Sequence, residues 1–304
     1  MTSDAASDRF AADHPYRDAG VGVVTQHHKT ATLAQALGGP GGMRLRTVEI
    51  DTDVLGTFTG DIKRVAGPVD TAIAKARLGI EATGHHRALA SEGSFGPHPV
   101  VGIVTHHREV VVLLDAHTGL TVVGHAEGLA PWTRSKIVST ADNPTHGRSD
   151  DLAQLVRDLD PPRHRLIARP EDAAGRHLDR GITKGISNGH DLRAAVARAA
   201  TWSTTGRVRV ETDLRAHMSQ LRHPLILQAA TDLAKRLAHR CTRCGSPGFG
   251  RVETLRGAPC RWCRSPTDSI LAHIDGCPAC EHRVRRSADG SDAADPGTCA
   301  ACNP

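Results

Sequence analysis

The feature that most constrains this chain is a set of eight cysteines near its C-terminal end, arranged as four Cys-x-x-Cys pairs. Fifteen residues separate the first two pairs and eighteen separate the last two, a spacing typical of four-thiolate structural zinc sites. Each pair turns back to present two thiolates, and the chain between two pairs returns to complete a tetrahedron. We therefore predict two structural zinc ions in a double zinc ribbon at residues 241–304, held by Cys241, Cys244, Cys260, Cys263, Cys277, Cys280, Cys299 and Cys302.

The spacing leaves two ways of pairing these cysteines. We predict sequential pairing, the first pair with the second and the third with the fourth; cross-braced pairing, first with third and second with fourth, is the alternative. Four thiolates leave no open coordination position, so these ions would hold the fold and would not catalyse. The N-terminal segment has no basic stretch followed by an apolar one, so we expect a cytoplasmic protein with reduced thiols.

The first 240 residues lack cysteine and must fold by ordinary packing. Residues 1–19 are charged and poor in large apolar groups, which predicts a disordered segment. Residues 20–240 mix strand and helix patterns, so we expect an α/β body with a mixed sheet flanked by helices and a ligand or catalytic site. The predicted strands lie at 21–24, 44–50, 100–104, 110–115, 120–124, 166–168 and 208–213, and the helices at 31–37, 69–83, 150–159, 191–202 and 223–238.

Charge and composition argue against some partners. The formal charge is +5, but the basic residues are spread along the chain and aromatic content is only 3%, which leaves few platforms for stacking nucleobases. No run of about 18 apolar residues exists, so no membrane partner is expected. Oligomeric state is not indicated by the sequence.

The segment Ser91–Pro99 reads as a small-residue loop that leaves a buried strand. It carries one carboxylate, Glu92, and one imidazole, His98, among glycines and prolines that disfavour helix. Loops on rigid strands often position reacting groups, so Glu92 is a candidate catalytic residue. We assign Ser91, Gly93, Ser94 and His98 to substrate binding. The alternative is an ordinary strand exit with a solvated Glu92.

A second polar loop follows the predicted strand at 21–24 and precedes the helix at 31–37. It would place Thr25, Gln26, His28 and Lys29 near a helix N-terminus, where backbone N–H groups favour anions such as phosphate. Lys29 is a candidate catalytic residue, and the other three are candidates for substrate binding. A loop at 181–186 adds a single lysine, Lys184, as a further candidate for substrate binding.

Two strands end in the same acidic pattern, Asp51-Thr52-Asp53 and Glu211-Thr212-Asp213. If the strands were parallel members of one sheet, these acids would meet at its carboxyl edge, where ligands bind in open α/β folds. Such a cluster would suit Mg²⁺ or Mn²⁺, with Asp51, Glu211 and Asp213 as ligands and Asp53 as a catalytic group. Ordinary turn chemistry by Asp and Thr is the alternative.

Several segments together resemble an uncharacterised bacterial family known only as a domain of unknown function. They are Gly-Thr-Phe-Thr-Gly at 56–60, Ser-Glu-Gly-Ser-Phe-Gly-Pro-His-Pro at 91–99, Val-Glu-Thr-Asp at 210–213 and the four terminal cysteine pairs. The resemblance covers roughly residues 20–304 and implies no established activity.

The order from 21 to 124 is also distantly similar to the house-cleaning nucleoside triphosphate pyrophosphatases of the inosine/xanthosine triphosphatase type. Thr25 and Lys29 match that family's first loop, with Gln26 where asparagine is expected. Ala74-Lys75-Ala76-Arg77 matches its helix, and Glu92-Gly93 its acidic loop. The resemblance implies that Lys29 neutralises phosphate, that Thr25 orients it, and that Glu92 holds a divalent ion or activates water.

The leading hypothesis is a hydrolase, dependent on Mg²⁺ or Mn²⁺, that acts on a nucleotide or a related phosphorylated small molecule. One alternative is a non-enzymatic protein whose zinc ribbons bind nucleic acid or a protein partner. Another is a metabolite-binding protein without turnover. The sequence alone leaves open whether the chain is an enzyme.

Overall fold

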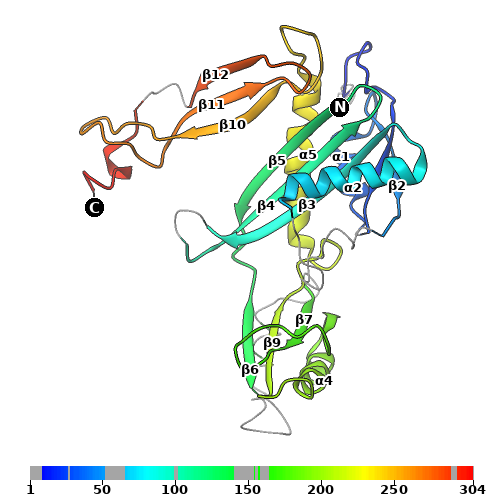
Figure 1. Cartoon of the computed structure of the whole chain (residues 1–304), viewed down its shortest axis with the longest axis vertical. Helices are drawn as coiled ribbons and strands as arrows, with labels where there is room; N and C mark the ends of the chain where they lie inside the picture. The colour runs from blue at the N-terminus through cyan, green and yellow to red at the C-terminus, as the bar shows by residue number, and fades with distance from the viewer. Residues whose placement is uncertain are drawn as a thin grey trace, which may run out of the picture.

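The computed structural model describes residues 9–26, 28–51, 66–98, 102–139, 154, 157, 164–288 and 293–303. Its fold is mixed α/β, as predicted, and the cysteine pairs lie on a C-terminal arm of three strands (Figure 1). The predicted body at 20–240 contains two separate sheets, one of five strands and one of four.

The five-stranded sheet has the order β2-β1-β3-β4-β5. The first three of these strands are parallel to one another, whereas β3, β4 and β5 form an antiparallel meander. The strands are β1 (Gly20–Val24), β2 (Arg44–Val48), β3 (Arg87–Pro97), β4 (Thr105–Asp115) and β5 (Leu120–Leu129). The sheet is therefore mixed, and β3 and β4 extend well beyond the carboxyl end of β1.

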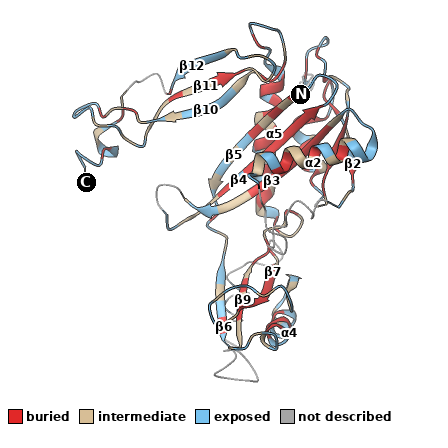
Figure 2. Cartoon of the chain, viewed as in Figure 1, coloured by how far each residue is buried: buried red, intermediate tan, exposed pale blue. Residues whose placement is uncertain are grey.

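Helices cover both faces of this sheet; β1, the first part of β3 and most of β4 are buried, whereas the edge strand β2 is largely exposed (Figure 2). On one face α1 (Thr30–Leu37) and α5 (His223–Ala238) bury leucines such as Leu33 and Leu233 against β1, β4 and β5. On the other face α2 (Pro68–Thr83), predicted at 69–83, buries Ala72 and Ala76, which lie one helical turn apart on one face of the helix. Gly84 ends α2 with φ of 67°, the left-handed conformation expected of a C-terminal glycine.

The four-stranded sheet has the order β6-β9-β7-β8, and every pair in it is antiparallel. Its strands are β6 (Ser135–Ser139), β7 (Leu166–Pro170), β8 (Thr183–Ile186) and β9 (Arg207–Thr212). Helix α4 (Gly189–Ala200) packs on it and begins at Asn188, whose side chain accepts a hydrogen bond from the Asp191 N–H. β9 therefore lies in a different sheet from β2 and runs antiparallel to its own neighbours, so the condition under which their acidic ends would meet is not fulfilled.

The N-terminal residues 9–19, which we expected to be disordered, pack against the five-stranded sheet. Phe10 and Tyr16 are buried in the same core as α1 and α5. The N–H group of Asp18 donates to the carbonyl of Gly42. Two aromatic rings bury enough apolar area to order a short segment that is otherwise polar.

Two predicted loops are strands. Residues 91–97 continue β3 and pair with β4 in register, from Ser91 opposite Val111 to Pro97 opposite Thr105. The glycines and prolines there suggested a loop, but Pro97 is the last residue of its strand, a position that proline tolerates. The other segment is the predicted loop at 181–186, most of which forms strand β8. In this strand Lys184 pairs with Ile167 of β7.

Other predicted elements are found close to the expected residues. The hairpin of β4 and β5, the short strand at 166–168 and the helix at 223–238 are all present. The helix predicted at 150–159 lies outside the described residues except for 154 and 157, and the strand predicted at 100–104 lies partly outside them.

The C-terminal arm consists of β10 (Gly250–Arg256), β11 (Ile270–Gly276) and β12 (Arg283–Ser287), which form an antiparallel sheet. It extends away from the end of α5 (Figure 1). Among the described residues, no helix combines the length and the apolar character needed to cross a bilayer.

Candidate functional site

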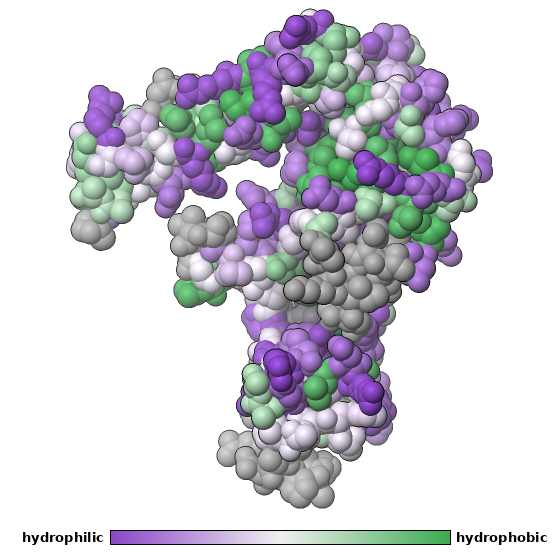
Figure 3. Space-filling model, viewed as in Figure 1, coloured by the Kyte–Doolittle hydropathy of each residue, from purple (hydrophilic) through white to green (hydrophobic). Residues whose placement is uncertain are grey.

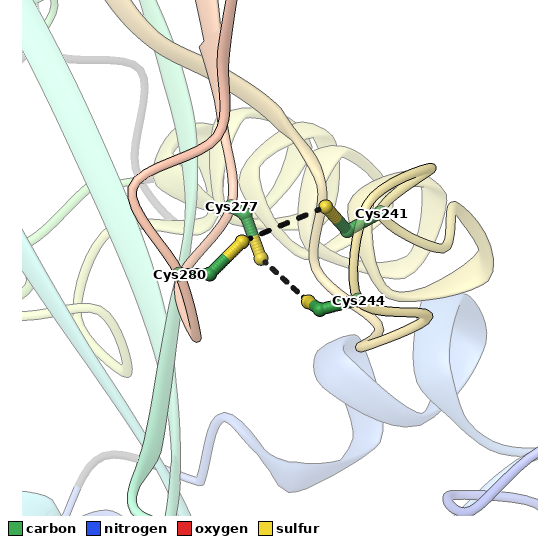
Figure 4. Close-up of side chains that lie close together, drawn as sticks. All are labelled: Cys241, Cys244, Cys277 and Cys280. Carbon is green, nitrogen blue, oxygen red and sulfur yellow. Dashed lines mark hydrogen bonds between the residues drawn. The ribbon is translucent and has the colours of Figure 1, made fainter.

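The eight cysteines form two clusters of four. Cys241 and Cys244 meet Cys277 and Cys280 at the base of the arm, where the four side chains point toward one another (Figure 4). The closest Sγ–Sγ distances there are 3.6 Å and 3.9 Å. A tetrahedron with Zn–S bonds of 2.3 Å has edges of about 3.8 Å, so the cluster could hold a zinc ion.

The second cluster joins Cys260 and Cys263 to Cys299 and Cys302. Its closest Sγ–Sγ distances are 3.5 Å and 3.8 Å, which fit zinc equally well. Each cluster could therefore hold one zinc ion, as the predicted count of two requires.

The clusters are cross-braced, so our prediction of sequential pairing is wrong. The physical reason is the direction of β10 and β11. Because these strands are antiparallel, the cysteine pair that precedes β10 lies beside the pair that follows β11. The pair that follows β10 lies at the opposite end of the arm and meets the last pair instead.

A second group of polar side chains surrounds the part of β3 just beyond the carboxyl end of β1. Lys29, which precedes α1, donates from Nζ to the Ser91 Oγ atom at 2.9 Å and to the Ser91 carbonyl at 3.3 Å. Lys29 is only 5% exposed, and its own N–H group donates to the Oγ1 atom of Thr25. The predicted loop lysine thus lies against the predicted catalytic segment.

The neighbouring residue, Glu92, points to the opposite face of the sheet because successive strand residues alternate. There it forms an ion pair with Lys75 of α2, and Glu92 is only 1% exposed. Two lysines therefore approach consecutive residues of β3 from the two faces of the sheet. We name Lys29, Ser91, Glu92 and Lys75 the lysine-carboxylate site.

Beside this site lies a buried ion pair between Glu109 of β4 and Arg222, the residue before α5. The Arg222 Nε and Nη2 atoms lie 2.8 Å and 2.6 Å from one Glu109 oxygen, and neither side chain is exposed. His107 contacts the same oxygen at 2.7 Å and stacks on Phe95 at 4.2 Å between ring centroids. The second oxygen of Glu109 is buried and has no hydrogen-bond partner among the described residues.

Burial shapes the charges of this region. It lowers the pKa of Lys29 to about 8, assisted by the nearby Arg222 and opposed by Glu109 and Glu92. For Glu109, burial alone would raise the pKa, but the Arg222 guanidinium and the hydrogen bond with His107 outweigh it and the pKa is about 2. Lys29, Lys75 and Arg222 supply three positive charges against two carboxylates, which leaves a sum of +1 over these described residues.

Several other predicted residues lie near this site. Gln26 donates from Nε2 to the Ile50 carbonyl and to Asp51 Oδ1, so Asp51 sits next to the first loop. His28 has a positive φ of 52°, which is uncommon for a residue with a side chain, and its ring lies 6.5 Å from that of His217. Ser94 and Gly93 continue β3 beyond Glu92.

The remaining predicted residues are not brought together. Glu211 pairs with Arg169, and Asp213 with Arg215, in and beside the four-stranded sheet. Lys184 is exposed on β8 of that sheet. His98 lies beyond β3, where its ring is 5.2 Å from that of His106, and Asp53 lies outside the described residues.

Acidic residues therefore do not gather as a metal site in the described part of the chain. The only groups there of three or more potential metal ligands are the two cysteine clusters. The reason is that β2 and β9 belong to different sheets, so their acidic ends do not share one edge.

A cleft of about 530 Å³ opens between the two sheets, beside Phe95. Phe95 and Thr105 line it from the larger sheet, and Arg169 and Glu211 line it from the smaller one. Its volume is that of a small-molecule site. Phe95, which lines the cleft, stacks on His107 and has the Arg222 guanidinium 5.6 Å from its ring centroid, so the cleft adjoins the two side chains that contact Glu109.

Sequence reasoning missed Glu109, Arg222 and His107, and it gave Lys75 no role. Glu109 and Arg222 are 113 positions apart, so no local pattern links them. Lys75 was part of the segment that resembles the pyrophosphatase helix, and that segment was the one signal that pointed to it.

Comparison with known proteins gives a family and no activity. A search of curated proteins found no match. A family model described as "Domain of unknown function (DUF6671)" matches residues 75–304, which include Lys75, Glu92, Glu109, Arg222 and all eight cysteines. The predicted uncharacterised family is thereby confirmed, and the chain belongs to the family described as Domain of unknown function (DUF6671).

Proposed function

We propose that this protein is a hydrolase of a nucleotide or a related phosphorylated small molecule, with the lysine-carboxylate site as its reaction centre. The observation that carries the proposal is the approach of Lys29 and Lys75, from opposite faces of the sheet, to Ser91 and Glu92. This point lies beyond the carboxyl end of a parallel strand, where ligands bind in open α/β folds. The distant likeness to nucleoside triphosphate pyrophosphatases supports the same residues.

Each side chain has a distinct task in this proposal. The ammonium groups of Lys29 and Lys75 neutralise phosphate oxygens and so favour attack by water on phosphorus. Glu92 accepts the proton of that water as the new bond to phosphorus forms and the bridging P–O bond breaks. Thr25 orients the phosphate from the first loop. A Mg²⁺ or Mn²⁺ ion would enter with the nucleotide, bound to its phosphates, because the described acidic residues do not gather as a metal site of their own.

Turnover of a nucleotide panel tests the proposal. Zinc-loaded protein is incubated with nucleoside di- and triphosphates and Mg²⁺ or Mn²⁺, and released phosphate and pyrophosphate are measured. Glu92→Gln should lower kcat by about 10²–10⁴-fold, the usual contribution of a general base. Glu81→Gln is the matched control, because that side chain is exposed near the end of α2 and lines none of the described cavities. A wild-type rate no higher than that of Glu92→Gln would reject the proposal, and ligand-induced thermal stabilisation without product would instead indicate a metabolite-binding protein.

One observation favours a second candidate, nucleic-acid binding by the zinc arm. Trp262 lies inside a Cys-x-x-Cys pair and is 76% exposed, with the exposed Arg261 and Arg264 on either side. An exposed ring between cations is a platform on which an unpaired base can stack. Binding of a labelled single-stranded oligonucleotide should fall with salt and be weakened by Trp262→Ala, but not by Trp202→Ala outside the arm. Equal binding of the oligonucleotide by the wild type, Trp262→Ala and Trp202→Ala would reject nucleic-acid binding through Trp262. The zinc ribbons would then be expected to bind a protein partner.

A further inference from the structure

A second cavity, of about 490 Å³, lies between the zinc arm and the five-stranded sheet. One wall belongs to the body, where the first turn of α2 and the strands β3, β4 and β5 contribute, and the other to β10 and β11 of the arm. The surface is hollowed between the arm and the body (Figure 3). The polar and basic residues that matter are Ser94, Arg108 and His125 from the body, and Arg251, Arg256 and His273 from the arm.

Guanidinium groups face this cavity from both walls. Arg108 comes from β4, while Arg251 and Arg256 come from the two ends of strand β10. Arg108 and Arg251 form no ion pair with any acidic side chain in the described part of the chain, and Arg256 donates to a main-chain oxygen, that of Asp268 at 2.8 Å. These three cations are therefore available to an anionic ligand.

Two of the three carboxylates that line the cavity have cationic partners. The nearest N–O distances are 2.6 Å for Glu109 with Arg222 and 3.5 Å for Glu253 with Arg283. Glu127 lies 3.6 Å from His106, but burial lowers the pKa of that imidazole, so the contact does not neutralise the carboxylate. The acidic groups thus offset only one of the three lining arginines. An anion entering the cavity would meet an excess of positive charge.

One neutral group also points to a ligand. The Oγ atom of Ser94 is buried and lacks a hydrogen-bond partner among the described residues. A buried hydroxyl without a partner is uncommon, because burial without a hydrogen bond is costly. A ligand oxygen in the cavity would satisfy it.

From these observations we propose that the cavity between arm and body binds a chain of phosphate groups, held by Arg108 on one side and by Arg251 and Arg256 on the other. Guanidinium groups bind phosphate through two parallel hydrogen bonds, and the volume accommodates a nucleotide. The zinc arm then has a direct role, because the cysteine cluster at its base fixes two of the three arginines relative to the sheet.

The cavity adjoins the lysine-carboxylate site but is distinct from it. Ser94 lies two residues beyond Glu92 on the same face of β3, and Val110, which also lines the cavity, is the register partner of Glu92. Lys29 and Lys75 are not among its lining residues. The proposed site therefore requires binding alone, whether or not Glu92 takes part in turnover.

Calorimetric titration of the zinc-loaded full chain with inorganic tripolyphosphate and with ATP, without divalent ions, tests this site. Both probes should bind, with affinity that falls as salt rises. Arg108→Gln and the double variant Arg251→Gln/Arg256→Gln should each weaken binding by at least about tenfold, as expected for the loss of charge-assisted hydrogen bonds. Arg285→Gln is the matched control, because it removes the same charge from the exposed strand β12 of the same arm. Tighter binding of ATP than of tripolyphosphate would add a contact to the nucleoside, and equal binding would assign recognition to phosphate alone.

Zinc content and circular dichroism identify variants that no longer fold. For such a variant, Arg108→Lys replaces Arg108→Gln, because it keeps the charge and removes only the two-pronged hydrogen bonding. Failure of both probes to bind, or equal weakening by Arg285→Gln, would overturn the site. The site would also be overturned if Lys29→Met and Lys75→Met abolished binding of the probes while the arginine variants bound them normally, because binding would then occur at the lysine-carboxylate site. Arginine-dependent binding without any turnover would uphold this site while rejecting the proposed hydrolase.

Discussion

The Nζ atom of Lys29 lies 2.9 Å from the Oγ atom of Ser91, a residue 62 positions later in the chain. This contact joins the loop after β1 to the extension of β3, and it leaves an ammonium group almost completely buried. A buried cation makes the stability of the fold depend on pH.

Replacing Lys29 by methionine should remove a rise of stability with pH. The pKa of Lys29 is lowered from 10.5 to about 8, chiefly by burial, so between these values the unfolded chain binds more protons than the folded one. The free energy of unfolding of the wild type, relative to Lys29→Met, should therefore increase by about 3 kcal/mol between about pH 8 and about pH 10.5. Urea unfolding of both proteins across this range measures it. If the difference in unfolding free energy between the two proteins stayed constant across this pH range, the pKa of Lys29 would not be lowered by folding.

The buried Glu109–Arg222 pair should be far more sensitive than an exposed one. Arg222→Met leaves the Glu109 carboxylate buried without its guanidinium, which typically costs about 3–5 kcal/mol. The double variant Glu109→Gln/Arg222→Met should recover part of this loss, because no buried charge remains unpaired. Chemical denaturation of the two single variants and the double variant gives the coupling energy.

Arg176→Met is the control for that experiment, since Arg176 is 81% exposed in its pair with Asp172. It should change stability by less than about 1 kcal/mol. A loss for Arg222→Met no larger than for Arg176→Met would contradict the role of the buried pair.

Zinc content distinguishes the two ways of pairing the cysteines. With cross-braced clusters, Cys244→Ser/Cys277→Ser removes ligands from one cluster and should retain one zinc ion per chain, whereas Cys244→Ser/Cys263→Ser disrupts both and should retain none. Sequential pairing would reverse these two results. Elemental analysis of the purified variants provides the measurement, and wild-type protein should contain two ions per chain.

Gly124 on β5 should not tolerate even a methyl group. A Cβ atom there would lie 2.5 Å from the main-chain nitrogen of Leu233 and 2.6 Å from its Cβ atom, so the strand packs directly on the backbone of α5. Gly124→Ala should therefore destabilise the fold by at least about 1–3 kcal/mol. Gly128→Ala on the same strand meets only a side-chain carbon, at 3.6 Å, and should be nearly neutral. Thermal unfolding of both variants checks this difference, and similar melting temperatures would contradict it.

The sequence by itself determined the elements whose signals are local. The alanine spacing of α2, its terminal Gly84 and the cap at Asn188 all act within a few residues of the helices that they define. The cysteine spacing likewise identified the eight thiols that form two clusters able to hold a metal ion, because each Cys-x-x-Cys turn is a local structure. The distant likeness to nucleoside triphosphate pyrophosphatases pointed to Lys29 and Glu92, and in the structure Lys29 contacts Ser91, the residue before Glu92.

Only the tertiary structure decided which of these elements meet. Pairing with β4 makes residues 91–97 a strand in spite of their glycines and prolines, and the antiparallel direction of β10 and β11 sets the cross-braced cysteine clusters. The Glu109–Arg222 pair depends on contacts across 113 positions, and β9 belongs to a sheet apart from β2. Such contacts form when strands and helices bury their apolar faces against one another. Which strands and helices pack together depends on the whole chain rather than on any one segment.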